Sequence, residues 1–259
     1  MFRKDSGFYS RVDDAIKGNW FMLLFWYVAV NSVSYFMSYS SDILVFKNYF
    51  GGINIIDIKD FFFTEFSFDF VSFSIGLITS ILGLMLNMEI LSFVRTKKFD
   101  IKNFGKYLIN YPVQIIGVSL ILYVVQSLVS YIPIVGFFID YFIYFAFSYA
   151  SYLVLVEKEK NPIKVLINSW NHTNGVKGEL LSKYIHYFKN GLIGMVVKYT
   201  GLIIATLSVS NKLIYMVAVI LAMLGFVASI VYKFKNSPYY YLACAMYFKE
   251  HMEYKGIRL

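Results

Sequence analysis

Residues 191–210 read GLIGMVVKYTGLIIATLSVS, an apolar stretch whose single charged residue, Lys198, lies near its middle. A helix of about 20 apolar residues is long enough to cross the ~30 Å hydrocarbon core of a bilayer. The stretch therefore predicts a membrane-spanning helix. A charge at that depth is costly unless it is paired or hydrated, so Lys198 is expected to face other helices rather than lipid.

Five more apolar runs of similar length occur in the chain, and no β-strand pattern competes with them. Of the 259 residues, 58% are hydrophobic and only 15% are charged, against roughly 25% charged in soluble domains. The sequence predicts an all-α polytopic integral membrane protein that forms a single domain, residues 1–259. The six expected spans are at about 20–37, 71–94, 109–131, 134–156, 190–209 and 213–232.

The first span has a second interpretation, a cleaved signal peptide, because the small residues SYSS occupy 38–41. Its bulky aromatic residues and Asn31 make a poor signal-peptide core, however. An uncleaved span is therefore the prediction.

Lysine and arginine are distributed unequally between the two sides that these spans define. The poorer side has Lys47, Lys59 and Lys212, whereas 20 of the 24 basic residues fall on the other side. The positive-inside rule predicts that this richer side, with both termini, is cytoplasmic. The net charge of +8 then reflects basic loops that contact anionic head groups, and no nucleic-acid partner is expected.

Each of the three span pairs follows a basic, partly apolar segment that is predicted to lie at the cytoplasmic interface. In the segment 157–189, Pro162 suits a helix start and NHTNG at 171–175 a helix end. The apolar face of this amphipathic helix is expected to contain Ile163, Leu166, Ile167 and Trp170.

The last segment, 237–252, is too short to span and predicts an interfacial helix with its tyrosines at head-group level. A re-entrant cover on the bundle is the alternative. The outer loop 38–70 is acidic and rich in aromatic residues. It either meets a cationic peptide or folds over the outer mouth of the bundle with its aromatic residues at the interface.

Catalytic and metal-binding patterns are scarce. His172, His186 and His251 do not pair at helical spacing, and Cys244 lies among apolar neighbours. No glycine-rich phosphate loop occurs. We therefore expect no enzyme activity, no metal and no cofactor, although a membrane-embedded enzyme stays a third hypothesis.

Three ionisable residues fall inside predicted spans, and such residues are candidates for function. Glu89 is about 8 Å from the inner end of its span, within reach of water, and Asp140 is about 9 Å from the outer end of its own. Lys198 is about 12 Å from the inner end. It is expected to bond to Asp140 or Glu89 in a dry bundle, or to face water and serve a function. The amides of Asn31, Asn87, Gln114 and Gln126 either extend a polar interior or join helices.

Four short motifs resemble a family. They are RVDDAIKGNW at 11–20, YIPIVGFFIDY at 131–141, SYASYLVLVEKEKNPIKVLINSWNHTNGVKGELL at 148–181 and SPYYYLACAMYF at 237–248. Their order resembles a domain-of-unknown-function family of bacterial six-span membrane proteins, similar to the membrane domain of glycerophosphodiester phosphodiesterases. The matching positions include Arg11, Gly18, Asn19, Trp20, Pro133, Gly136, Glu157, Ser169, Gly175, Lys177, Pro238 and Tyr239.

The resemblance implies a bacterial cytoplasmic-membrane protein, and some members of the family look like bacteriocin accessory or immunity proteins. The chain lacks the phosphodiesterase catalytic domain, so hydrolysis is not implied. The leading hypothesis is a non-enzymatic accessory or immunity-type factor that binds a peptide, a lipid or another membrane protein. The alternative is a small transporter, or the permease subunit of an ABC-type system, that uses an intramembrane charge pair.

Overall fold

A computed structural model describes residues 7–32, 70–130, 135–157, 159–208 and 210–257, and in these ranges the regular structure is helical throughout. Within these described ranges, five helices are long and apolar enough to cross a membrane, which supports the all-α membrane class. The first predicted span is represented by a shorter apolar helix, Trp20–Ser32. The other helices are α1 (Phe8–Ile16), α4 (Phe70–Thr96), α5 (Lys102–Asn110), α6 (Pro112–Ser130), α7 (Val135–Ala146), α8 (Ala150–Glu157), α9 (Pro162–Thr173), α10 (Lys177–Leu207) and α11 (Lys212–Tyr254).

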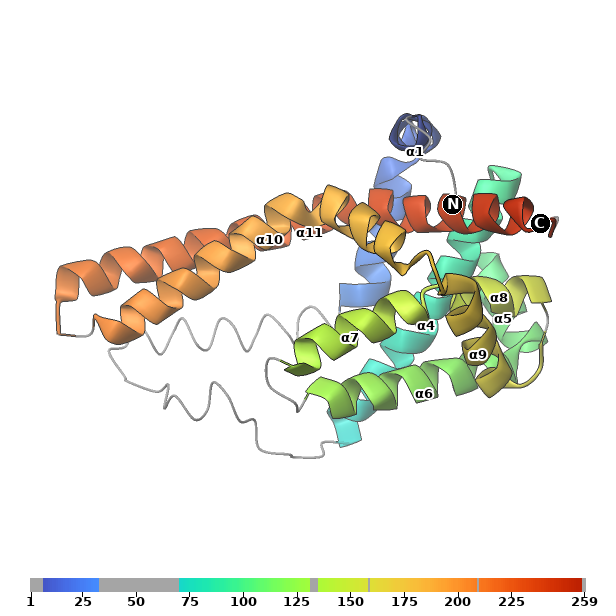
Figure 1. The fold of residues 1–259 in the computed structure, drawn as a ribbon, viewed down its shortest axis with the longest axis horizontal. Coiled ribbons are helices and arrows are strands. Elements are labelled where there is room, and N and C mark those ends of the chain that lie inside the picture. Colours follow the sequence, from blue (N-terminus) through green and yellow to red (C-terminus); the bar gives the residue numbers. More distant parts are fainter. Residues whose placement is uncertain (1–6, 33–69, 131–134, 158, 209, 258–259) are drawn as a thin grey trace.

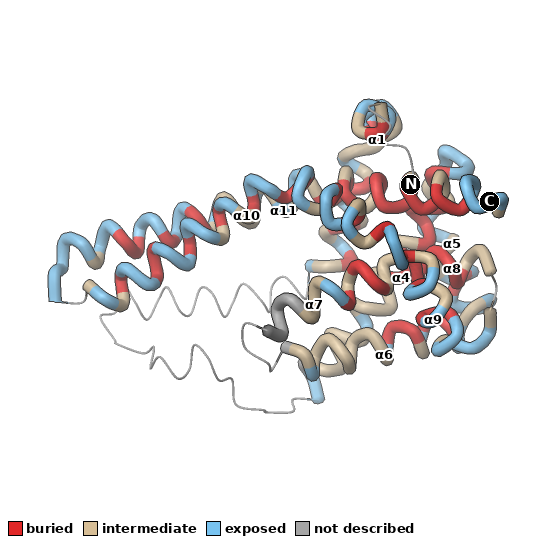
Figure 2. The backbone as a smooth tube through the Cα atoms, in the orientation of Figure 1, coloured by how far each residue is buried: buried red, intermediate tan, exposed pale blue. Residues whose placement is uncertain are grey.

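The helices form a body and a long hairpin. Figure 1 shows α10 and α11 side by side, projecting away from a body that contains the other helices. The body holds the large buried cluster, whereas the hairpin buries mainly the stripe along which its two helices touch (Figure 2). The predicted outer loop 38–70 lies almost entirely outside the described residues.

Small residues allow the two hairpin helices to approach closely. A Cβ atom added at Gly201 would lie 2.7 Å from the backbone oxygen of Ala218 and 2.7 Å from the backbone nitrogen of Ala222. One at Gly194 would lie 2.8 Å from the backbone nitrogen of Ser229. Membrane helices associate in this way because backbone contact replaces a hydrophobic driving force that lipid does not provide.

The sequence prediction of a separate C-terminal helix at 237–252 is wrong, because α11 continues unbroken through Pro238 to Tyr254. One face of its second half is buried in the body, and the other face includes exposed residues such as Tyr254. Tyr240, Phe248 and Met252 are at most 1% exposed and pack in the main core. Tertiary packing of this apolar face outweighs the tendency of proline to end a helix.

The fourth predicted span is bent where α7 gives way to α8. The backbone N–H of Ala150 donates to Phe147 O at 2.9 Å, one residue short of the α-helical acceptor. Ala146 O accepts instead from the hydroxyls of Ser169, at 3.1 Å, and Thr173, at 2.9 Å. Side chains of α9 thus satisfy the carbonyl that the bend leaves unpaired.

Helix α9 begins and ends as predicted. Asn161 Oδ1 accepts from the backbone N–H of Ile163 at 2.9 Å, Pro162 occupies the first turn, and Gly175 follows with φ +85°. Of the predicted apolar face, Leu166 is buried, whereas Ile163, Ile167 and Trp170 are exposed on the protein surface, as the apolar face of an interfacial helix would be. The buried face includes Ser169 and Thr173, whose hydroxyls reach the bend after α7. The rest of the predicted segment 157–189 belongs to α10, which starts at Lys177.

Candidate functional site

Lys198 lies in the interface between α10 and α11 and is 7% exposed. Its Nζ atom is 4.9 Å from the ring centroid of Tyr199 and 5.4 Å from that of Phe226. Cation–π contact of this kind stabilises a desolvated ammonium group. Gly225 lies against the backbone of Lys198. The lysine side chain therefore begins where the two helices of the hairpin approach each other most closely.

Glu89 is fully buried and does not reach water at the end of its span. Its carboxylate accepts three hydrogen bonds from the α5 region: from the Tyr107 hydroxyl at 2.8 Å, from Asn103 Nδ2 at 3.0 Å and from the backbone N–H of Asp100 at 2.7 Å. Burial, and then the hydrogen bond to this carboxylate, raise the pKa of the Tyr107 hydroxyl. Glu89 therefore anchors α5 to α4 rather than pairing with Lys198.

Asp140 belongs to a small cavity of about 230 Å³ between α7, α10, α11 and the helix Trp20–Ser32. Its Oδ1 atom is buried and has no hydrogen-bond partner among the described residues. Lys233 of α11, which the sequence places in the cytoplasmic tail, lines the same cavity and is exposed. The other lining residues are aromatic: Tyr27, Tyr141, Tyr144, Tyr184, Phe188, Tyr240 and Tyr241.

A larger cavity of about 360 Å³ lies next to it, between α4, α6, α7, α8, α11 and the helix Trp20–Ser32. None of its described lining residues is Asp, Glu, Lys or Arg. Uncharged polar groups line much of it, namely Asn31, Thr79, Ser80, Asn87, Ser119, Gln126, Ser148 and Ser151. Three of the four amides that the sequence analysis singled out are in this set.

Several polar atoms around this cavity are unsatisfied within the described part of the chain. Oδ1 of Asn87, Oγ of Ser119 and the hydroxyl of Tyr240 are buried without a hydrogen-bond partner there. Ser119 is 0% and Tyr240 is 1% exposed. Buried polar groups are normally paired, so such a cluster beside a cavity indicates groups that a ligand or water satisfies.

Three tyrosines, Tyr144, Tyr240 and Tyr241, line both cavities. In addition, Gln126 of the larger cavity is within hydrogen-bonding reach of the Asp140 carboxylate in the smaller one. The two cavities therefore adjoin each other, and one has a neutral polar lining while the other has a charged and aromatic lining. This pair of cavities is the candidate functional site.

The motif positions near the start of the chain hold α1 and the helix Trp20–Ser32 against α11. Arg11 bonds to Glu250 at 2.8 Å, and the indole N–H of Trp20 donates to Lys235 O at 3.2 Å. Gly18 has φ +78° between the two helices, and the Asn19 amide donates to Lys17 O at 3.4 Å. These residues have a clear structural role.

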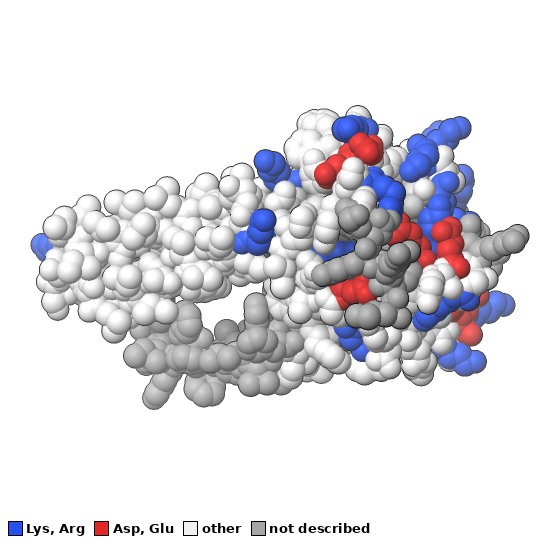
Figure 3. Space-filling view, turned by 45° about the horizontal axis from the view of Figure 1, so that its top comes forward, with Lys and Arg blue, Asp and Glu red and all other residues white. Residues whose placement is uncertain are grey.

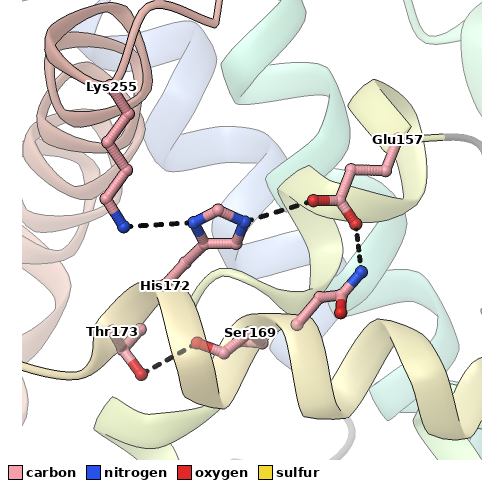
Figure 4. A network of polar contacts seen from close by, with 6 residues as sticks. Glu157, Ser169, His172, Thr173 and Lys255 are labelled. Atoms are coloured by element: carbon pink, nitrogen blue, oxygen red, sulfur yellow. Dashed lines mark hydrogen bonds and ion pairs between the residues drawn. The ribbon is translucent and has the colours of Figure 1, made fainter.

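The central motif positions join α8, α9, α10 and the end of α11 (Figure 4). Glu157 accepts from Asn168 Nδ2 at 2.6 Å and contacts His172 Nε2 at 3.3 Å, while Lys255 Nζ lies 3.3 Å from His172 Nδ1. Nζ of Lys177 lies 4.0 Å from the Trp170 ring centroid. Ser169 and Gly175 take part in the bend and the turn described above.

The remaining motif positions differ in what the structure shows. Tyr239 stacks on Tyr187 with ring centroids 6.1 Å apart, and Pro238 is buried inside α11. Pro133 lies outside the described residues, and Gly136 falls in the first turn of α7. Within the described ranges, no three His, Cys, Asp or Glu residues converge as metal ligands.

Charge is concentrated at one end of the molecule. Figure 3 shows acidic and basic side chains over the body, on the side that carries α1 and the end of α11, and a nearly uncharged hairpin surface. Such a surface suits an apolar layer around the hairpin and water around the charged end.

The fold and the cavities together define an all-α protein with several helices that are long and apolar enough to cross a membrane. Comparisons of the chain with protein-family models, with curated proteins and with solved structures found no match.

Proposed function

We propose that this chain is a non-enzymatic multi-pass protein that binds an amphipathic ligand from the membrane, a lipid or a peptide, in its paired cavities. One observation carries the proposal: the larger cavity is lined by uncharged amide and hydroxyl groups, several of which are buried without a protein partner. Such groups suit the ester, amide and hydroxyl groups of a lipid or peptide. A cavity of about 360 Å³ is also within the size range of ligand sites.

The proposed arrangement has six spans, with α1 and the end of α11 on the cytoplasmic side of a bacterial cell membrane. The concentration of charge at that end and the excess of Lys and Arg in the same segments support it. In a Cys244→Ser background, a cysteine at Lys212 should react with a membrane-impermeant reagent in intact cells, and one at Gly178 should not. The reverse pattern would contradict this orientation.

Gly83 of α4 offers a direct test of ligand binding, because it lines the larger cavity and a Cβ atom added there meets nothing within 4 Å. Gly83→Phe should fill the cavity without a clash. Native mass spectrometry of wild-type protein purified in mild detergent should show a bound ligand that this variant loses. Gly178→Phe is the matched control, since Gly178 is exposed, also has open space and lies outside the cavities. Equal retention by all three proteins would overturn the proposal.

Some members of the family that the motifs resemble look like bacteriocin accessory or immunity proteins, which motivates a protective role for this binding. Cells that express the protein should then survive a panel of cationic antimicrobial peptides better than cells that do not. Gly83→Phe should remove the protection and Gly178→Phe should keep it. Unchanged sensitivity of wild-type cells across the panel would count against the immunity role but not against ligand binding.

A transporter is the second candidate, and the observation that favours it is the presence of Asp140 and Lys233 in a cavity next to the larger one. Opposite charges that line a cavity are typical of substrate and proton pathways. Lys198, the residue singled out for this role, does not line either cavity. Flux into proteoliposomes that depends on Asp140 and not on Lys198 would favour transport.

A further inference from the structure

The smaller cavity has a composition that restricts its ligand more than the larger cavity does. Of its nine lining residues in the described part of the chain, six are tyrosines and one is Phe188, and the other two, Asp140 and Lys233, carry opposite charges. The rings come from α7, α10, α11 and the helix Trp20–Ser32, so they surround the cavity from several directions. Such a group of aromatic residues with a carboxylate is typical of a site for an ammonium group.

The two charges differ in their access to the surface. Lys233 is exposed, which places it at the open side of the cavity. Asp140 is half-buried, and its Oδ1 atom is buried without a hydrogen-bond partner among the described residues, as is the hydroxyl of Tyr240. The inner part of the cavity therefore offers an acceptor to a cationic donor, and the open side offers a cation to an anion.

A ligand with one charge fits this arrangement poorly. A simple cation would meet Lys233 at the entrance, and a simple anion would meet the Asp140 carboxylate inside. A ligand that carries both charges can contact both residues favourably, with its ammonium group against Asp140 and the tyrosine rings and its anionic group against Lys233. The cavity of about 230 Å³ accommodates a small zwitterionic group and not a whole lipid.

A zwitterionic phospholipid carries both of the required charges in one small head group, an ammonium and a phosphate. We propose that the smaller cavity binds the head group of a zwitterionic phospholipid, with its ammonium near Asp140 and its phosphate near Lys233.

This inference rests on the proposed function and names the ligand class of the same site. The test uses the full chain in detergent and calorimetric titration with short-chain lipids: dihexanoyl phosphatidylethanolamine, dihexanoyl phosphatidylglycerol, and free phosphoethanolamine. The zwitterionic lipid should bind at least about tenfold more tightly than the anionic lipid, which lacks the ammonium group. Tighter or equal binding of phosphatidylglycerol would overturn the inference, as would free phosphoethanolamine binding as tightly as the zwitterionic lipid.

Variants of Asp140 and Lys233 test which charged group of the lipid each residue contacts. Asp140→Asn, which keeps the side-chain size, should remove the preference for the zwitterionic lipid, and the exposed change Lys233→Gln should weaken both lipids. Glu253→Gln and Lys249→Gln make the same changes in an ion pair of α11 outside the cavities and should alter neither affinity. If Asp140→Asn fails to fold, an unchanged affinity of Lys233→Gln for both lipids still overturns the inference. If Gly83→Phe loses the bound ligand but Asp140→Asn keeps the preference for the zwitterionic lipid, this inference is overturned. The proposed function is then still supported.

Discussion

Replacement of Glu89 by glutamine should release α5 from α4, because the carboxylate is the shared acceptor of three hydrogen bonds. The donors are the Tyr107 hydroxyl, Asn103 Nδ2 and the backbone N–H of Asp100, at 2.7 to 3.0 Å. A hydrogen bond to a charged group contributes about 1.5–3 kcal/mol, and a buried donor left without an acceptor costs about 1–3 kcal/mol. Glutamine keeps one acceptor oxygen but directs an NH₂ group toward a donor.

From these values, Glu89→Gln should lower the free energy of unfolding by about 2–4 kcal/mol, and Tyr107→Phe by about 1.5–3 kcal/mol. Because the two side chains are in contact, the double variant should lose less than the sum of the single ones. The matched control, Glu253→Gln, makes the same change at an exposed ion pair and should stay within about 0.5 kcal/mol of wild type.

The measurement combines denaturant unfolding in detergent with hydrogen exchange of the α5 amides, residues 102–110. In Glu89→Gln these amides should exchange faster than in wild type, while those of α10 and α11 keep their protection. If Glu89→Gln matches the control in stability and its α5 amides exchange as slowly as in wild type, Glu89 does not anchor the helix.

Two further predictions concern the hairpin and the bend. Gly201→Ala should destabilise the protein by about 1–3 kcal/mol, because its Cβ atom would meet the α11 backbone at 2.7 Å. Gly191→Ala, with contacts of 3.7 Å, should be neutral or stabilising by up to about 1 kcal/mol. Denaturant unfolding of the two variants checks this, and equal stabilities would contradict it. Ser169→Ala alone should have a small effect because Thr173 still donates to Ala146 O, but Ser169→Ala with Thr173→Val should cost about 1–3 kcal/mol beyond the single changes. Additive losses in a double-mutant cycle would show that the two hydroxyls do not share the carbonyl.

The sequence predicted that the long apolar helices exist, because hydrophobic length is a local property, but it missed the start of α10 and the end of α11. Asn161, Pro162 and Gly175 marked the ends of α9 for the same reason, since capping depends on neighbouring residues. The continuity of α11 through Pro238 depends instead on packing against distant helices. Composition around that proline therefore predicted a boundary that the fold does not have.

The candidate site was predicted only in part. Amides inside spans indicated a polar interior, and Asn31, Asn87 and Gln126 do line the larger cavity. The role of Glu89 was missed because its donors come from a separate helix, 11 to 18 residues further along the chain. Lys233 was predicted to follow the last span on the cytoplasmic side, since nothing local shows that a continuous helix places it beside a cavity that also contains Asp140.

The central position of the second half of α11 has a consequence for assembly. Helices α1 and α4 pack against it, and the rings of Tyr149 and Tyr152 contact Phe248, yet all of these partners precede α11 in the chain. At about 5–20 residues per second, roughly 5 to 20 s separate the synthesis of Glu157 from that of Tyr254. During that interval the inner faces of the earlier helices lack the surface of α11 that buries them. Synthesis of the last helix is thus the step that completes the core.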